Sequence, residues 1–144
     1  MSNTTDTASA APAFLADWAP RLLSVLRIMS ALLFLAHGTQ KILGFPPMAG
    51  GRPLPDAFTL SWSAGVLELV GGVLLALGLF TRPVAFVLSG EMAFAYFIGH
   101  APRSFFPTLN GGDAAILFCF LFLYLAAAGP GSYSVDGARE GRAN

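Results

Sequence analysis

The sequence has few charged residues. Only 11% of its 144 residues are charged, the eight basic residues balance the eight acidic ones, and the formal net charge is +0. A nucleic-acid-binding protein usually carries a basic stripe, so this balance argues against a nucleic-acid partner. Hydrophobic residues make up 55% of the chain, and the mean hydropathy is +0.65. Both values exceed those of soluble domains and predict an integral membrane protein whose main partner is the lipid bilayer.

Cysteine is scarce as well. Cys119 is the one cysteine of the chain, which excludes an intrachain disulfide, a CxxC redox pair and a thiolate zinc cluster. Its apolar surroundings indicate a small buried residue. The acids and histidines lack the ExxH spacing of carboxylate metal sites, so we expect no metal centre.

Four apolar segments, at about residues 22–43, 61–80, 83–100 and 114–128, are long enough to be helices across or nearly across a bilayer. They predict an all-α fold, an integral membrane four-helix bundle with four transmembrane helices and a short hairpin between the second and third. The expected domain division is a flexible N-terminal tail at 1–20, a transmembrane domain at 21–130 and a polar C-terminal tail at 131–144.

An even number of spans places both termini on one side of the membrane. Arg21, Arg82, Arg139 and Arg142 belong to that side, against Lys41, Arg52 and Arg103 on the other. Because basic residues are enriched on the cytoplasmic side, this small excess predicts that both termini are cytoplasmic.

Two acids lie near the middle of apolar segments, Glu68 in the second and Glu91 in the third. A charge at the bilayer centre costs about 2.5–3.5 kcal/mol on insertion scales, so such acids are functional candidates by default. Their distances along the two helices from the connecting hairpin differ by roughly 6 Å, so the two acids lie at similar depths in the membrane. They could therefore share one polar pocket. At least one should then be protonated or paired with a cation. The alternative is two separately satisfied structural glutamates.

Small residues share a helix face with Glu68, namely Ser61, Gly65, Gly72 and Ala76. Such a face allows a neighbouring helix to approach closely, so Glu68 should point into the bundle.

The first helix carries Arg27, His37 and Lys41 within an arc of roughly 80°, so one face can present all three inward. Each has an alternative: Arg27 could snorkel to the surface, Lys41 could be an interfacial anchor, and His37 could be a hydrogen-bonded packing residue. Inward orientation would create a cationic rim above the two glutamates, and the bundle should open on that loop side.

His100 and Asp113 lie on the same loop side. His100 follows Glu91 by nine positions, which is about half a turn around a straight helix, so both face the centre only if the helix distorts before Pro102. A haem held by His37 and His100 is an alternative with a weak signal.

The chain resembles the DoxX family of small four-helix membrane proteins. The resemblance covers about residues 27–136 and rests on Arg27, Glu91 and three motifs, His37–Ile42, Gly65–Arg82 with its Gly-Gly pair, and Gly129–Asp136. One departure is Asp113, where the family often has Glu. The resemblance implies a bacterial inner-membrane protein associated with quinone-linked sulfur oxidation or with complexes that handle thiol and oxidative stress.

The preferred hypothesis is a quinone-interacting subunit of a redox system, with a quinone as ligand or cofactor. Glu68 and Glu91 would exchange protons with the quinol oxygens. The expected ligand-binding residues are Arg27, His37, Lys41, His100 and Asp113. Because the chain lacks redox cysteines, electrons would come from a redox partner protein. The alternatives are a non-enzymatic lipid or small-anion binding or transport module, which would need a homo-oligomer, and an assembly factor whose buried charges fix helix register.

Overall fold

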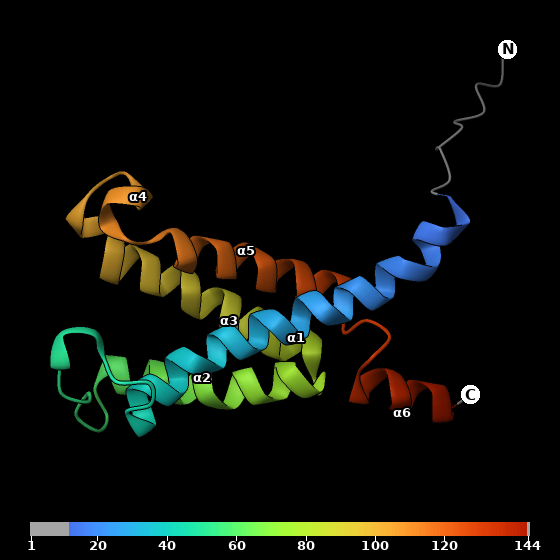
Figure 1. Cartoon of the computed structure of the whole chain (residues 1–144), viewed down its shortest axis with the longest axis horizontal. Helices are drawn as coiled ribbons and strands as arrows, with labels where there is room; N and C mark the ends of the chain where they lie inside the picture. The colour runs from blue at the N-terminus through green and yellow to red at the C-terminus, as the bar shows by residue number, and fades with distance from the viewer. Residues whose placement is uncertain (1–11, 144) are drawn as a thin grey trace, which may run out of the picture.

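The computed structural model describes residues 12–143, and within that range it contains helices and loops but no strand (Figure 1). The prediction of an all-α fold is therefore confirmed. The main helices are α1 (Ala13–Leu43), α2 (Leu60–Leu77), α3 (Thr81–Ala95) and α5 (Asp113–Ala128). The shorter elements are η1 (Ala49–Gly51), η2 (Tyr96–His100), η3 (Ala101–Arg103), α4 (Pro107–Asn110) and α6 (Val135–Ala143).

Three helical segments are long and apolar enough to cross a membrane: Phe14–Leu43, Leu60–Leu77 and Thr81–Arg103. The fourth, α5, is also apolar but has only 16 residues. Large apolar side chains such as Leu33, Phe86 and Leu117 point outward and are more than half exposed. An exposed apolar surface of this kind suits a hydrocarbon solvent.

The first helix begins earlier than predicted. Because α1 starts at Ala13, the expectation of a flexible tail over 1–20 is wrong for residues 13–20. The Ser- and Thr-rich composition that suggested a tail ends before this point, and Ala13–Ala19 is rich in good helix formers. The remainder of the predicted tail, residues 1–11, lies outside the described residues.

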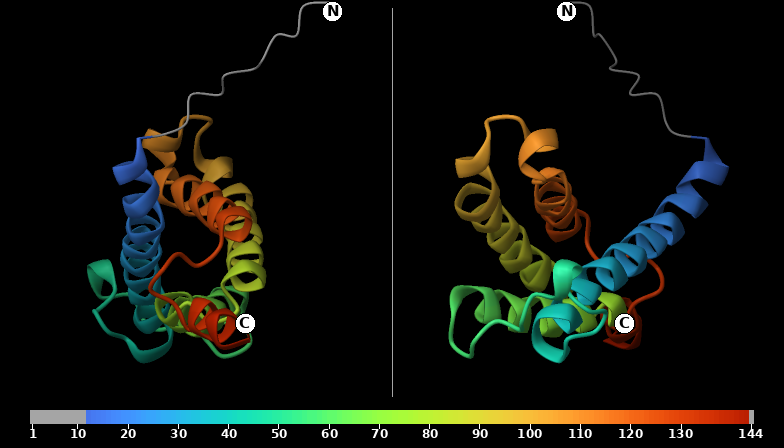
Figure 2. Two further views of the ribbon diagram at one scale, coloured as in Figure 1. Left: turned by 90° about the vertical axis from the view of Figure 1, so that its right-hand side faces the viewer. Right: turned by 60° about the vertical axis from the view of Figure 1, so that its left-hand side comes forward.

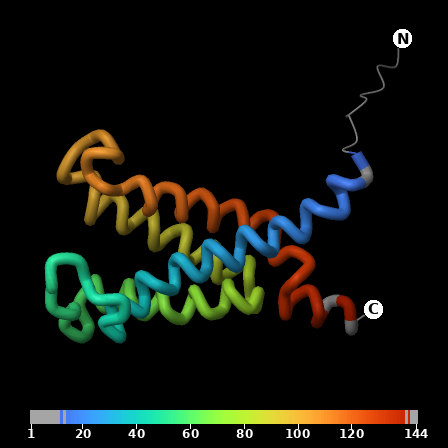
Figure 3. The backbone as a smooth tube through the Cα atoms, in the orientation of Figure 1, coloured from blue at the N-terminus to red at the C-terminus, as the bar shows by residue number. Residues whose placement is uncertain are grey.

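The helices form two pairs. α1 packs along α2, α3 packs along α5, and a smaller contact between α2 and α3 joins the pairs, as the backbone trace shows (Figure 3). At the crossing of α1 and α5, the ring of Phe34 lies 4.9 Å from that of Phe122 and 5.5 Å from that of Phe118. The buried core around this crossing also includes Leu75, Leu88 and Leu125.

Glycine brings α1 and α2 together. A Cβ on Gly38 would lie 2.5 Å from the backbone nitrogen of Leu69, and one on Gly72 would lie 3.1 Å from Cα of Leu35. The prediction that the small-residue face of the second helix allows close approach is confirmed at Gly65 and Gly72, which are buried. Ser61 is exposed and lies outside this close contact.

The start of α1 and the last helix, α6, lie at the same end of the molecule as the turn between α2 and α3 (Figures 1 and 2). That turn is short, as predicted: Gly78 ends α2 in the left-handed conformation at φ 67°, and α3 begins at Thr81. The loop over 44–59 and the short helix α4 occupy the opposite end, called the loop end below.

Candidate functional site

A cleft of about 510 Å³ lies between α2 and α3 in the half of the molecule nearer the loop end. One wall comes from α2, with Ser61, Ala64 and Leu67, and the other comes from α3 and η2, with Glu91 and Ile98. Leu67 and Ile98 at the rim are 44% and 52% exposed. The mouth therefore extends along the apolar flank between α2 and α3 and is not confined to the loop end, where the sequence placed it.

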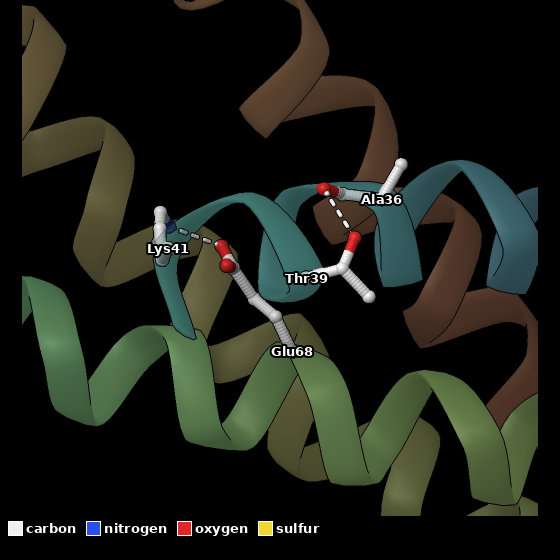
Figure 4. Close-up of polar contacts among 4 residues, drawn as sticks. All are labelled: Ala36, Thr39, Lys41 and Glu68. Carbon is white, nitrogen blue, oxygen red and sulfur yellow. Dashed lines mark hydrogen bonds and ion pairs between the residues drawn. The ribbon is translucent and has the colours of Figure 1, made fainter. Parts of the chain in front are cut away.

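Lys41 closes the polar end of the cleft, where Nζ lies 2.6 Å from Oε1 of Glu68. Figure 4 shows the Glu68 side chain reaching from α2 to the last turn of α1. Gly65 allows this approach, because a Cβ there would lie 2.8 Å from Cβ of Lys41. The nearby Thr39 hydroxyl donates to the carbonyl of Ala36 at 3.1 Å, so it does not compete for the carboxylate.

Glu68 points inward, as predicted, and is only 3% exposed. Lys41 is its cationic partner and is more than an interfacial anchor. The pair uses one carboxylate oxygen only: within residues 12–143, Oε2 of Glu68 is buried without a hydrogen-bond partner. A buried acceptor in that state costs free energy until a donor reaches it.

Glu91 lines the cleft from α3. Both of its carboxyl oxygens are buried, and neither has a hydrogen-bond partner in the described part of the chain. Lys41, the ion-pair partner of Glu68, lines the same cleft. An isolated carboxylate at this depth is unfavourable, which leaves Glu91 ready to hold a proton or to accept a hydrogen bond from a ligand.

His100 reaches the same cleft because the helix is distorted before it. Tyr96–His100 is a π-helix, in which the N–H of Ala101 bonds the carbonyl of Tyr96 five residues earlier. The extra residue in this turn rotates His100 relative to a straight α-helix, and π turns of this kind are frequent at functional sites. The sequence analysis required a helix distortion before Pro102 for Glu91 and His100 to face the same side, and the π-helix is such a distortion.

The His100 ring is oriented by the end of α4. Its Nδ1 lies 3.1 Å from the carbonyl oxygen of Asn110. A carbonyl only accepts, so Nδ1 donates its hydrogen, and in the neutral ring Nε2 is left as an acceptor. The polar end of the cleft therefore combines several acceptors with one ammonium group.

Two predicted ligand residues lie outside this cleft. The His37 ring is exposed and stands edge-on to Phe118, with centroids 6.4 Å apart. Asp113 is the exposed first residue of α5 and does not line the cleft. The structure does not bring His37 to the cleft beside His100, so it does not assemble the haem pair.

Arg27 occupies a separate position and is fully buried, so the alternative that it snorkels to the surface is wrong. Its guanidinium donates to Pro130 O at 2.8 Å, to Ala76 O at 2.9 Å, and to the carbonyls of Leu75 and Tyr133. These bonds tie the end of α2 to the segment after α5. Arg27 is a structural clamp and does not line the cleft.

Asp136 is a partner that the sequence did not reveal. Its carboxylate accepts from the backbone N–H groups of Phe80 and Thr81 at 2.9 and 2.8 Å, capping α3 from α6. Although burial by itself raises the pKa of Asp136, the hydrogen bonds from Thr81 and Phe80 outweigh it and hold this pKa below its ordinary value. One signal of this contact was available in the sequence. The hairpin between the second and third helices and the segment that contains Asp136 belong to the same predicted side of the membrane.

Comparison with known proteins gives a consistent assignment. The chain is 47% identical over 127 residues to an uncharacterized protein of Haemophilus influenzae, covering 85% of this chain and 93% of the relative. It is 32% identical over 127 residues to the inner membrane protein YphA of Escherichia coli, covering 81% and 89%. It is 29% identical over 161 residues to the uncharacterized membrane protein Rv3486 of Mycobacterium tuberculosis, covering 95% and 94%. No solved structure matches the chain. The DoxX family model matches residues 22–101, and the chain therefore belongs to the DoxX family.

Proposed function

We propose that this protein is a multi-pass inner-membrane protein in which α1, α2, α3 with η2, and α5 all cross the bilayer, with both termini in the cytoplasm. The long apolar helices support the spans, and the name of the Escherichia coli relative supports the location. At about 1.5 Å per residue, α5 spans roughly 24 Å, a few ångströms less than the hydrocarbon core, a mismatch that local thinning accommodates. The excess of basic residues at the end that holds both termini supports the orientation.

Its proposed activity is to bind a quinone-class molecule in the cleft, as a subunit of a quinone-linked oxidoreductase system. The observation that carries this proposal is the Glu91 carboxyl, whose two oxygens are buried without partners in the described chain, beside the Lys41–Glu68 pair and His100. A quinol headgroup carries two hydroxyl groups on an apolar ring. Such a molecule matches a cleft with hydrogen-bond acceptors at one end and apolar walls elsewhere.

The arrangement favours the reduced form of the ligand. His100 Nε2 is an acceptor, and Glu91 is a further acceptor when ionised, whereas Lys41 is the one cation among the described residues that line the cleft. A quinone offers only acceptors, but a quinol offers two O–H donors. Oxidising a quinol releases two protons and two electrons. In this proposal Glu91 and His100 accept the protons, and the electrons pass to a redox partner protein, because the single cysteine leaves no dithiol in the chain.

A lipid-binding module or an assembly factor is the second candidate. The apolar cleft walls favour a lipid, and the bonds of Arg27 and Asp136 show that some charged groups serve the fold alone. A small anion is disfavoured, because the charge of Lys41 is already balanced by Glu68.

The test is equilibrium binding of decylubiquinol and decylubiquinone to the purified protein in nanodiscs. Wild type should prefer the quinol, and Glu91→Gln should weaken its binding up to about tenfold, because a neutral carbonyl replaces a charged acceptor. Asp113→Asn is the matched control, since Asp113 does not line the cleft, and it should bind as wild type does. Equal, negligible binding to all three proteins would overturn the proposal, and tight co-purification of phospholipid alone would favour the lipid-binding module.

A further inference from the structure

We propose that the seam between α2 and α3 holds an extended isoprenoid tail of the ligand whose headgroup occupies the cleft. This inference rests on the proposed function and adds to it the class of ligand, a tailed lipid quinol, and the direction in which it lies. The polar head would sit at the loop end and the tail would run toward the end that holds the termini.

A second cavity, of about 250 Å³, continues the cleft along the same two helices. Leu67 and Val87 line both cavities, so the two are parts of one groove. The second part is lined only by apolar residues and glycine, among them Val70, Leu74 and Val84. It therefore has nothing to offer a polar headgroup and suits a hydrocarbon chain.

The groove exists because α2 and α3 pack mainly against other helices. α2 packs along α1 and α3 along α5, and the contact between α2 and α3 is smaller. The floor of the groove is closed at Gly71, which lets α2 and α3 approach closely there, since a Cβ would lie 2.8 Å from Cδ2 of the buried Leu88. The connection at 78–81 is too short to fill the seam from its own end.

The polarity of the groove is ordered along its length. Lys41, Glu91 and His100 all lie in the first cavity, and the second contains no charged residue. From Ser61 to Leu74 the groove follows about 13 residues of helix, or roughly 20 Å, which is longer than a single-ring headgroup needs. Val70 and Val87 are 53% and 51% exposed, so a tail can enter sideways from the bilayer.

The experiment compares two quinols with the same headgroup, one with a long isoprenoid tail and one with a methyl group in its place, in wild type, Val70→Trp and Val73→Trp. Val70 lines the second cavity, whereas Val73 is another exposed valine on α2, 43% against 53%, that lines neither cavity. Val70→Trp should weaken binding of the tailed quinol at least tenfold and leave the tail-less quinol unchanged. Val73→Trp should bind both as wild type does. Because each variant is compared with wild type for the same ligand, partitioning of the tail into lipid cancels.

The outcomes separate the two proposals. Equal binding of the tailed quinol to Val70→Trp and Val73→Trp would overturn the tail groove and leave headgroup binding in the cleft intact. Negligible binding of both quinols to wild type would overturn the proposed function and the tail groove with it. Thermal unfolding of both variants in the same nanodiscs checks that they fold.

Discussion

Lys41 Nζ lies 2.6 Å from Oε1 of Glu68, and this contact joins the last turn of α1 to the middle of α2. The two residues are 27 positions apart, and they meet because Gly65, one turn before the acid, leaves space for the lysine. The pair stabilises a buried carboxylate with one oxygen and leaves the other without a partner in the described chain. It can therefore fix the fold and still leave one buried acceptor unused.

Removing Lys41 alone should be more harmful than removing the whole pair. Lys41→Met leaves an unpaired buried carboxylate and should destabilise the protein by up to about 3 kcal/mol, reduced by the partial exposure of Lys41. Lys41→Met combined with Glu68→Gln should regain part of that loss, because no buried charge remains. Thermal unfolding in detergent measures both, and a double variant that is less stable than the single one would contradict this account.

Gly38 should tolerate no side chain. In Gly38→Ala the new Cβ would meet the backbone of Leu69 at 2.5 Å, and separating two helix backbones should cost about 1–3 kcal/mol. Gly90→Ala is the matched control within a helix, because no atom lies within 4 Å of a Cβ at that position. It should be neutral or stabilising by up to about 1 kcal/mol. Equal melting temperatures for the two variants would show that α1 and α2 are less closely packed than described.

Arg27 should not be replaceable by lysine. Its planar guanidinium donates to four carbonyls in two segments, the end of α2 and the segment after α5, and an ammonium group cannot reproduce that fork. Arg27→Lys should therefore lose about 3 kcal/mol or more, since several buried carbonyls lose their donors.

Arg21→Lys controls for the change of residue type. Arg21 is exposed and lies 5.6 Å above the ring of Trp18, so this variant should change stability by less than about 1 kcal/mol. The two variants are compared by yield after membrane extraction and by melting temperature. If Arg27→Lys had the yield and the melting temperature of wild type, Arg27 would not be the structural clamp described above.

Asp136 should make stability depend on pH in the acid range. Its pKa is lowered in the folded protein, so the stabilisation is fully present above the unfolded-state pKa of about 3.9 and is lost as pH falls through the folded value. In Asp136→Asn this loss should be absent, and at pH 7 the weaker cap should cost about 0.5–1 kcal/mol.

The measurement for Asp136 is the difference in melting temperature between wild type and Asp136→Asn from pH 7 to pH 3. Because other carboxyls titrate in both proteins, only this difference is informative. It should shrink as pH falls below about 4, and a constant difference would show that the carboxylate charge does not contribute.

The π-helix should be necessary for ligand binding but not for folding. Deleting Gly99 should restore α-helical register and rotate His100 away from the cleft, and a Cβ at Gly99 would touch no neighbour. Decylubiquinol affinity should fall about tenfold, the equivalent of one hydrogen bond, with little change in melting temperature. Gly99→Ala keeps the length of the turn and adds only one methyl group to the cleft lining, so it should lose less affinity than the deletion does. Unchanged affinity after the deletion would remove His100 from the site.

Composition and periodicity alone determined much of this protein. The apolar segments identified the main helices and the all-α class, because each segment is a local property of about 20 residues. The glycine spacing on α2 likewise identified the face that packs against α1, since neighbours on a helix face are fixed by its 3.6-residue repeat. Glu68 and Glu91 were recognisable as candidates because apolar spans rarely contain acids.

The tertiary structure alone decided which partner each charged group has. Lys41 forms an ion pair with Glu68. Arg27 donates to carbonyls up to 106 positions away, and Asp136 accepts from the start of a helix 55 positions away. The rotation and tilt of each span depend on long-range packing, which local sequence does not encode. His100 reached the cleft only through a π turn, a one-residue irregularity that a regular helical repeat cannot represent.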